Sequence, residues 1–196
     1  MAHTETVRHF RETEAKPLIF RPCIIVFAGL PFTGKTALGR ELASMSNFLF
    51  LDVDDARLEI FHKTPMLSPD FERERMLLAY QRNHAKASAY VLGNQPVIIG
   101  TTYSRDYYHD MLRELPTPLR VFLLGAPDDV IQQRIEDRSP NSSSNITTFE
   151  EYLRTKEYFK PPPALTETFD TSLPVSVNTE QILQALAGSR ARVITH

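Results

Sequence analysis

The chain has 196 residues, of which 42% are hydrophobic and 23% charged, and its formal net charge is −2. This is the composition of an ordinary globular domain, and no apolar run approaches the roughly 18 residues that a membrane span requires. The single cysteine, Cys23, excludes an intrachain disulfide, and the lack of a basic tract argues against binding to long nucleic acid. We therefore expect one cytoplasmic domain with no membrane partner.

The first patterned segment is a short apolar run at residues 23–28, which is rich in β-branched residues and predicts a buried parallel strand. A complete G-x-x-x-x-G-K-T motif follows at residues 29–36, and leucines four apart then indicate a helix. Strand, glycine loop and helix are the context of a phosphate-binding loop, in which Lys35 reaches the β- and γ-phosphates and Thr36 binds Mg²⁺. The residues expected to bind ATP are Gly29, Leu30, Pro31, Phe32, Thr33, Gly34, Lys35, Thr36 and Ala37.

The remaining elements alternate along the chain. Apolar runs predict strands at residues 48–51, 96–99, 119–124 and 173–177, the last one weak and at a sheet edge because of Pro174. Helical spacing and capping signals predict helices at residues 56–62, 70–92, 104–115, 127–138, 148–160 and 179–188, with N-caps at Ser104, Thr148 and Thr179. Such alternation predicts an α/β protein with a doubly wound parallel sheet.

In such a sheet the carboxyl ends of neighbouring strands share one crevice. The phosphate loop, residues 52–55 and residues 100–103 should therefore meet there. A polar segment at residues 139–145 suits a mobile lid. The six histidines have no metal-binding spacing, so we interpret them as structural.

Three further stretches follow the phosphate loop along the chain: residues 54–57 (Asp-Asp-Ala-Arg), residues 102–105, and Arg134 with Arg138. Their order and spacing are typical of one family of proteins. With them the chain resembles the small P-loop kinases, in particular the group of polynucleotide 5′-hydroxyl kinase domains, zeta-toxin-like kinases and AAA_33-type kinases. The resemblance implies a P-loop NTPase fold with a five-stranded sheet in the order 2-3-1-4-5. It also implies a kinase domain at residues 22–188 with a helical lid at about 134–160, flanked by an N-terminal arm (1–21) and a C-terminal tail (189–196).

The resemblance further assigns roles to residues of the acceptor side. Asp54 matches the acidic residue that faces the acceptor hydroxyl, where it would orient the oxygen or take its proton. Arg57 matches the phosphate-binding arginine of the polynucleotide kinase D-x-x-R pattern, and Thr102 and Arg105 match acceptor contacts. Asp52 would contact Mg²⁺ through water. The alternatives are that Asp54 caps a helix and that Asp52 is a plain strand-end carboxylate.

Arg134 and Arg138 lie four residues apart on one helix face and resemble lid arginines that close over the ATP phosphates. The alternative is a solvated face that pairs with neighbouring acids. One departure from the family pattern concerns Gly100, where an aspartate often helps to hold Mg²⁺. Its absence would shift metal binding to Asp52, Asp54 and the P-loop threonine.

Three functions remain open at this point. The one we expect is Mg²⁺-dependent transfer of the ATP γ-phosphate to a hydroxyl of a small molecule, with Lys35, Asp54, Arg134 and Arg138 as catalytic residues. A nucleotide or polynucleotide 5′-hydroxyl kinase is the second, kept open by Arg57 but disfavoured by the few basic residues near the crevice. A catalytically weak nucleotide-binding regulatory module is the third, suggested by Gly100. The sequence specifies neither the acceptor nor the oligomeric state.

Overall fold

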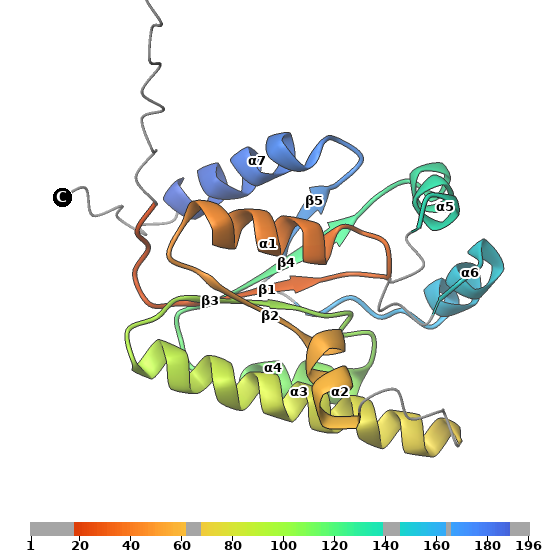
Figure 1. Ribbon diagram of the computed structural model, residues 1–196, viewed down its shortest axis with the longest axis horizontal. Coiled ribbons are helices and arrows are strands. Elements are labelled where there is room, and N and C mark those ends of the chain that lie inside the picture. The colour runs from red at the N-terminus through yellow and green to blue at the C-terminus, as the bar shows by residue number, and fades with distance from the viewer. Residues whose placement is uncertain (1–17, 62–67, 139–145, 164–165, 189–196) are drawn as a thin grey trace, which may run out of the picture.

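The computed structural model describes residues 18–61, 68–138, 146–163 and 166–188 (Figure 1). Most of the expected N-terminal arm, His62, the polar segment at 139–145 and the C-terminal tail lie outside these residues. None of the helices in the described ranges is long and apolar enough to cross a membrane.

Five parallel strands form the sheet, and their order, β2-β3-β1-β4-β5, is the one that the resemblance implied. The strands are β1 (Ile24–Ala28), β2 (Leu49–Asp52), β3 (Val97–Gly100), β4 (Leu119–Gly125) and β5 (Thr166–Asp170). β1 pairs with both β3 and β4, and all five of its residues are buried. Its unbroken apolar sequence follows from this central place, because helices cover both faces of a parallel sheet. The first four predicted strands are confirmed to within one or two residues.

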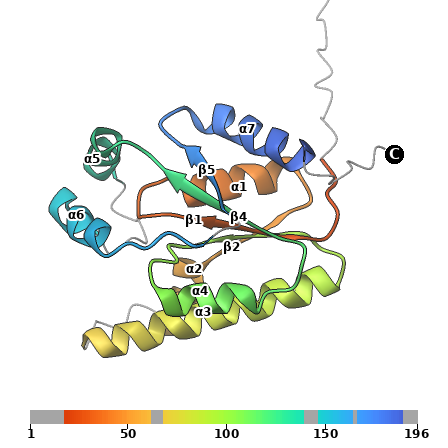
Figure 2. The ribbon, with the colours of Figure 1, turned by 180° about the vertical axis from the view of Figure 1, so that it is seen from behind.

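Seven helices surround the sheet within the described ranges: α1 (Lys35–Met45), α2 (Val53–Phe61), α3 (Pro69–Leu92), α4 (Asp106–Arg113), α5 (Asp128–Glu136), α6 (Phe149–Glu157) and α7 (Val175–Gly188). Both views show α1 and α7 on one face of the sheet and α2, α3 and α4 on the other (Figures 1 and 2). Helices α5 and α6 lie together at the end of the sheet where β4 ends.

The core has two main parts, one on each face of the sheet. Ile24 and Val26 of β1 pack toward α2, α3 and α4, whereas Ile25 and Phe27 pack toward α1 and α7. This division follows from the alternation of side chains along a strand. A third, smaller cluster joins Leu30 of the phosphate loop to α5 and α6. It holds these two helices against the loop, next to the site described below.

The prediction of a fifth strand at residues 173–177 is wrong. β5 lies earlier, at Thr166–Asp170, and α7 begins at Val175. Pro174 stands just before the first turn of α7 and its carbonyl accepts a hydrogen bond from Asn178 N–H, because a proline fits the start of a helix as well as a sheet edge. The predicted N-cap, Thr179, therefore lies inside the helix. β5 has no apolar run that would predict a strand, because its sequence is mostly polar, as is possible for a strand at the edge of a sheet.

Helix starts are the other difference from expectation. The N-cap of α4 is Arg105 rather than Ser104, and no side chain caps this helix. α2 begins at Val53, directly after β2, rather than at residue 56. The capping box at Thr148 is confirmed. The Thr148 hydroxyl accepts a hydrogen bond from the N–H of Glu151, and the Glu151 carboxylate accepts one from the N–H of Thr148.

Candidate functional site

The phosphate loop joins β1 to α1 in a conformation that its glycines permit. Gly29 has a φ of 148°, and a Cβ there would lie 2.3 Å from the carbonyl oxygen of Leu124 in β4. Gly34 is the N-cap of α1, with a left-handed backbone and no side-chain cap. The N–H groups of the first turn of α1 are therefore left for an anion, and the helix dipole favours a phosphate there.

Lys35 extends over this loop. Its ammonium donates to the carbonyl oxygens of Gly29 (3.0 Å) and Leu30 (2.7 Å). Burial lowers the pKa of Lys35 to about 8, although Asp54 and Asp52 act against this shift. The cation is thus held at the place where phosphate charge would need it.

Thr36 and Asp52 form the part of the site that could hold Mg²⁺. The Thr36 hydroxyl donates to Asp52 Oδ2 at 2.7 Å, and Asp52 Oδ1 accepts the backbone N–H of Asp54 at 2.9 Å. No group of three or more His, Cys, Asp or Glu side chains surrounds a metal position in the described part of the chain. Two oxygen ligands nevertheless fit Mg²⁺, which usually keeps several waters and binds phosphate oxygens as well.

Asp54 lies in the first turn of α2 and faces the same cavity. Because Asp52 caps this turn, the Asp54 carboxylate is not used as the helix cap, which was the alternative role. Burial, followed by the charge of Asp52, raises the pKa of Asp54 to about 6, although Arg57 and Lys35 act in the opposite direction. A carboxylate with this pKa can exchange a proton near neutral pH.

Arg57 lies beneath Asp54 and is not among the residues that line the cavity. It is 6% exposed, with its Nε 3.8 Å from Asp54 Oδ1 and its Nη1 3.6 Å from Glu72 Oε1. The structure therefore places it as a link between two carboxylates. A direct contact with substrate phosphate, which the D-x-x-R pattern suggests, is not what this arrangement provides.

Packing explains why position 100 is a glycine, and the glycine in turn affects which residue supplies the acid beside Thr36. A Cβ at this position would lie 2.9 Å from the ring of Phe50, whose Cε2 would also lie 2.2 Å from a Cβ at Gly39. The ring thus occupies space that an aspartate at position 100 would need. Gly100 is the register partner of Asp52, which extends from the neighbouring strand to Thr36. The acidic group beside the P-loop threonine therefore comes from β2 instead of β3.

The opposite wall of the cavity contains residues that our sequence reasoning missed. Helix α3 contributes Glu72, Met76 and Tyr80, and α4 contributes Tyr108, whose ring stacks on that of Tyr80 at 4.1 Å. The spacing of four between the α3 residues is a detectable signal, because it marks one helix face. This face of α3 combines an acid, Glu72, with the largely apolar side chains of Met76 and Tyr80.

The loop after β3 brings Thr102 and Ser104 to the cavity, but Arg105 points elsewhere. Arg105 lies over the ring of Tyr158 at 5.5 Å and lines an adjoining cavity of about 260 Å³ with Arg154. Of the two predicted acceptor contacts in this loop, only Thr102 lines the main cavity.

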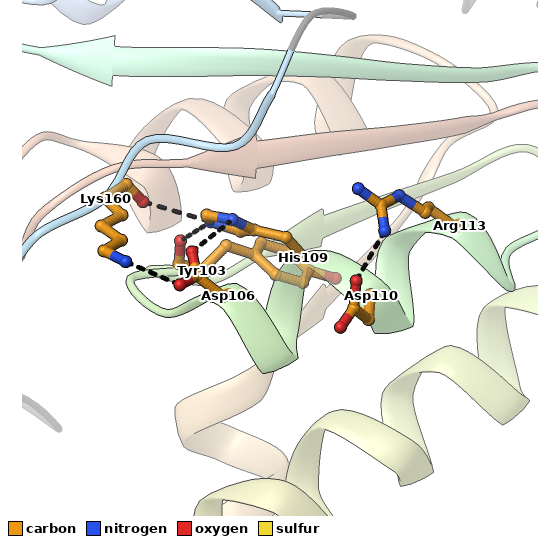
Figure 3. A network of polar contacts seen from close by, with 6 residues as sticks. All are labelled: Tyr103, Asp106, His109, Asp110, Arg113 and Lys160. Atoms are coloured by element: carbon orange, nitrogen blue, oxygen red, sulfur yellow. Dashed lines mark hydrogen bonds and ion pairs between the residues drawn. The ribbon is translucent and has the colours of Figure 1, made fainter.

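A polar network connects the loop after β3 to the segment after α6 (Figure 3). His109 Nε2 lies 2.9 Å from the carbonyl oxygen of Tyr103 and 3.1 Å from that of Lys160, so this nitrogen carries the proton and donates to both. Lys160 Nζ donates to Asp106 at 2.6 Å, and Lys160 N–H donates to the Ser104 carbonyl. The segment after α6 is thereby tied to the floor of the cavity.

The two arginines of α5 have different surroundings. Arg134 lines the cavity and donates to the carbonyl oxygen of Phe32 at 2.9 Å and to Thr171 at the end of β5. Arg138 lies beyond the last residue of α5 and donates to the Ile146 carbonyl at 2.8 Å. It is not among the residues that line the cavity, so in this structure the two arginines do not share the cavity wall.

Together these residues enclose a cavity of about 510 Å³ with the phosphate loop on one side and Asp54, α3 and the β3–α4 loop on the other. The structure thus brings Lys35, Thr36, Asp52, Asp54, Thr102 and Arg134 together, and leaves Arg57, Arg105 and Arg138 outside the lining.

Known structures share this architecture. The chain is similar to a sugar kinase from Janibacter sp. HTCC2649, with a TM-score of 0.65, 21% identity, and coverage of 89% of this chain and 99% of the other. It is also similar to a gluconokinase from Sinorhizobium meliloti 1021 (TM-score 0.59, 17% identity, 86% and 98% coverage) and to a shikimate kinase from Bacteroides thetaiotaomicron (0.59, 17%, 84% and 98%). At such identities the likeness shows the fold. No curated relative matches the sequence.

The family comparison is more direct, because residues 24–162 match the AAA_33 family, described as an AAA domain. This range begins with β1 and includes the phosphate loop, Asp54 and both arginines of the α5 region. It covers well over half of the chain, and it confirms the resemblance on which the site residues were chosen. The protein belongs to the AAA_33 family of P-loop proteins.

Proposed function

We propose that the protein is a kinase that transfers the γ-phosphate of ATP to a hydroxyl group of a small molecule. The observation that carries the proposal is the position of Asp54, whose carboxylate lines the same cavity as the phosphate loop. A carboxylate in this place, with a pKa near 6, suits an acceptor hydroxyl that must lose a proton. The sugar, gluconate and shikimate kinases that share the fold make a small-molecule acceptor the simplest choice.

On the donor side, the free N–H groups at the start of α1 and the Lys35 ammonium would bind the phosphates of ATP. Thr36 and Asp52 would hold Mg²⁺, which when bound offsets phosphate charge. Arg134 would add a further positive charge next to the loop.

On the acceptor side, Asp54 would orient the hydroxyl and take its proton as the oxygen attacks the γ-phosphorus. A new O–P bond then forms, the bond between the γ-phosphorus and the bridging oxygen breaks, and ADP leaves with that oxygen. Such a reaction depends on positioning and charge stabilisation more than on covalent chemistry. Arg57 would hold the Asp54 carboxylate in place from beneath.

The two other functions have less support. A polynucleotide 5′-hydroxyl kinase needs a cation for substrate phosphate beside Asp54, and Arg57 is occupied between Asp54 and Glu72. A binding-only module has no use for a carboxylate with a raised pKa in this position. The glycine at position 100 is a weaker argument for an inactive protein, because Asp52 supplies an acid beside Thr36 in place of the missing aspartate.

The test is an acceptor screen that follows ADP release, performed with the wild type, Asp54→Asn and Asp55→Asn. Asp55 is the matched control, because it is the next carboxylate along α2 but is exposed and pairs with Arg40 at 3.7 Å. We expect Asp54→Asn to lower kcat at least about 100-fold, the usual contribution of a general base, with ATP affinity unchanged. Asp55→Asn should stay within about twofold of the wild type. Full activity of Asp54→Asn, or ATP binding without turnover of any acceptor, would contradict the proposal.

A further inference from the structure

The acceptor half of the cavity is the wall that faces the phosphate loop, and its composition restricts the acceptor. Its members come from α2, α3, α4 and the loop after β3: Val53, Asp54, Glu72, Met76, Tyr80, Thr101, Thr102, Ser104 and Tyr108. No lysine or arginine belongs to this set among the residues that the structure describes. Both cations that line the cavity, Lys35 and Arg134, lie on the phosphate-loop side.

The two carboxylates of this wall already have countercharges. Arg57 pairs with both Asp54 and Glu72, and Arg75 pairs with Glu72 at 3.3 Å. Arg75 is itself 2% exposed and lies over the rings of Phe61 and Phe71. Because this cluster is balanced, it gives an amine on the acceptor little electrostatic attraction. A carboxylate or phosphate would be worse placed, since it would meet Asp54 and Glu72 without a facing cation from the described part of the chain.

The rest of the wall is apolar or carries neutral hydroxyls. Val53, Met76 and the stacked rings of Tyr80 and Tyr108 provide apolar surface. The Tyr80 hydroxyl accepts the backbone N–H of Tyr103 at 3.1 Å, which fixes this ring in place. Thr102 and Ser104 add hydroxyls that can exchange hydrogen bonds with an alcohol, whereas the Thr101 side chain is hydrogen-bonded to Tyr80.

We propose that the part of the acceptor that carries the reacting hydroxyl is uncharged and has an apolar face that packs between α2, α3 and α4. This rests on the proposed kinase function and names the class of its substrate. It differs from an acid such as a sugar acid, and from a nucleotide with phosphate close to the hydroxyl. The restriction concerns the reacting part of the molecule, since Arg105 and Arg154 line the adjoining cavity, which shares Ser104 and Thr155 with the main one.

The test compares alcohols that keep the same hydroxyl groups and differ in charge. One set is 4-(hydroxymethyl)benzamide, 4-(hydroxymethyl)benzoate and 4-(aminomethyl)benzyl alcohol, and a second set pairs glucuronamide with glucuronate and N-acetylglucosamine with glucosamine. ADP release gives kcat/KM for each compound, and thermal shift with a non-hydrolysable ATP analogue gives binding independently of turnover. We expect the neutral member to exceed its anionic partner at least about tenfold and its cationic partner severalfold.

A designed cation sharpens the test. Met76→Arg would place a guanidinium in the acceptor half, and Leu78→Arg is the matched control because Leu78 is 48% exposed on the outer side of the same helix. Met76→Arg should reduce or reverse the preference of the enzyme for the neutral alcohol over the anionic one. Leu78→Arg should leave this preference unchanged. A reversal caused by Leu78→Arg as well would point to general surface charge and overturn the assignment.

The remaining outcomes separate this inference from the kinase proposal. Faster phosphorylation of the anionic or cationic members would overturn the inference and leave the kinase function standing. Preferential binding of neutral members without ADP release would support the inference and contradict the kinase function. If no member of either set binds or reacts, both are rejected for alcohols of this size.

Discussion

The two halves of the cavity are built in opposite ways. The phosphate-loop half comes mostly from one continuous stretch, residues 29–36, with Asp52 added from β2 and Arg134 from α5. The acceptor half is assembled from α2, α3, α4 and the loop after β3, which are separated by tens of residues along the chain. Under the proposed function, the first half would bind a nucleotide, a ligand that many proteins share, and the second would have to fit a particular substrate.

Because of this difference, we expect the two halves to tolerate different kinds of substitution. A loop that grips phosphate through backbone N–H groups and one ammonium depends on a few residues whose loss cannot be compensated. A wall of separate side chains can exchange its members one at a time and so change the acceptor. Variants in each half should therefore show whether the two halves can be separated experimentally.

The strongest test of the donor half is Lys35→Ala. We expect ATP affinity and kcat to fall together, with kcat/KM for ATP reduced on the order of 1000-fold, because an electrostatic contact to the transferred phosphoryl group is lost. Steady-state kinetics and calorimetric titration with ATP provide the measurement. Lys86→Ala is the control, since this lysine pairs with Glu59 on the surface of α3. An unchanged ATP affinity in Lys35→Ala would show that the loop is not the donor site.

Arg134 and Arg138 allow a comparison between an arginine that lines the donor half and one that lies outside the lining. Arg134→Ala should lower kcat about 100-fold, the usual cost of losing one donor to transition-state charge. Arg138→Ala should cost less than about threefold, because Arg138 itself does not line the cavity and its guanidinium is bound to the Ile146 carbonyl. Measured kcat values for both variants decide the point. Equal losses would indicate that both arginines reach the phosphates when the site closes.

The boundary between the halves can be tested through Gly100. In Gly100→Ala the new methyl group would press on the Phe50 ring, and we expect a loss of about 1–3 kcal/mol in the free energy of unfolding, as for an overpacked core. Gly125→Ala is the control, because a Cβ there would meet nothing within 4 Å. Chemical denaturation measures both. A double variant with Phe50→Leu should recover part of the loss, and the absence of any recovery would exclude the ring as the cause.

The pH profile should show one limb from each half. Below pH about 6 Asp54 gains a proton and cannot accept another, so kcat/KM should fall by about tenfold per pH unit. Above pH about 8 Lys35 loses its proton and its charge, so binding of ATP should weaken as the pH rises. Asp54→Asn should remove the acidic limb from its residual activity and keep the alkaline one. An acidic limb that persists in this variant would identify a different base.

The sequence was most informative where function depends on consecutive residues. The phosphate loop, its strand and its helix could be recognised together, and the family resemblance singled out Asp54 among the acidic residues that follow the next strand. The four recognisable strands and the capping box at Thr148 were equally accessible, because each depends on local pattern. The fifth strand was misplaced because a polar edge strand has no apolar signal, and Pro174 fits either a sheet edge or a helix start.

Tertiary structure alone decided what surrounds those residues. Burial of Arg57 between Asp54 and Glu72 depends on how α3 packs against α2, and no local pattern contains this information. The Phe50 ring beside Gly100 likewise links β2 to β3 across the sheet and explains why the acid beside Thr36 comes from Asp52. The sequence by itself therefore determined the α/β class, the first four strands and the phosphate loop, because each of these depends on contiguous residues, and the strand order followed from the family resemblance. The acceptor wall was decided by packing between distant elements, which sets both its shape and its balance of charge.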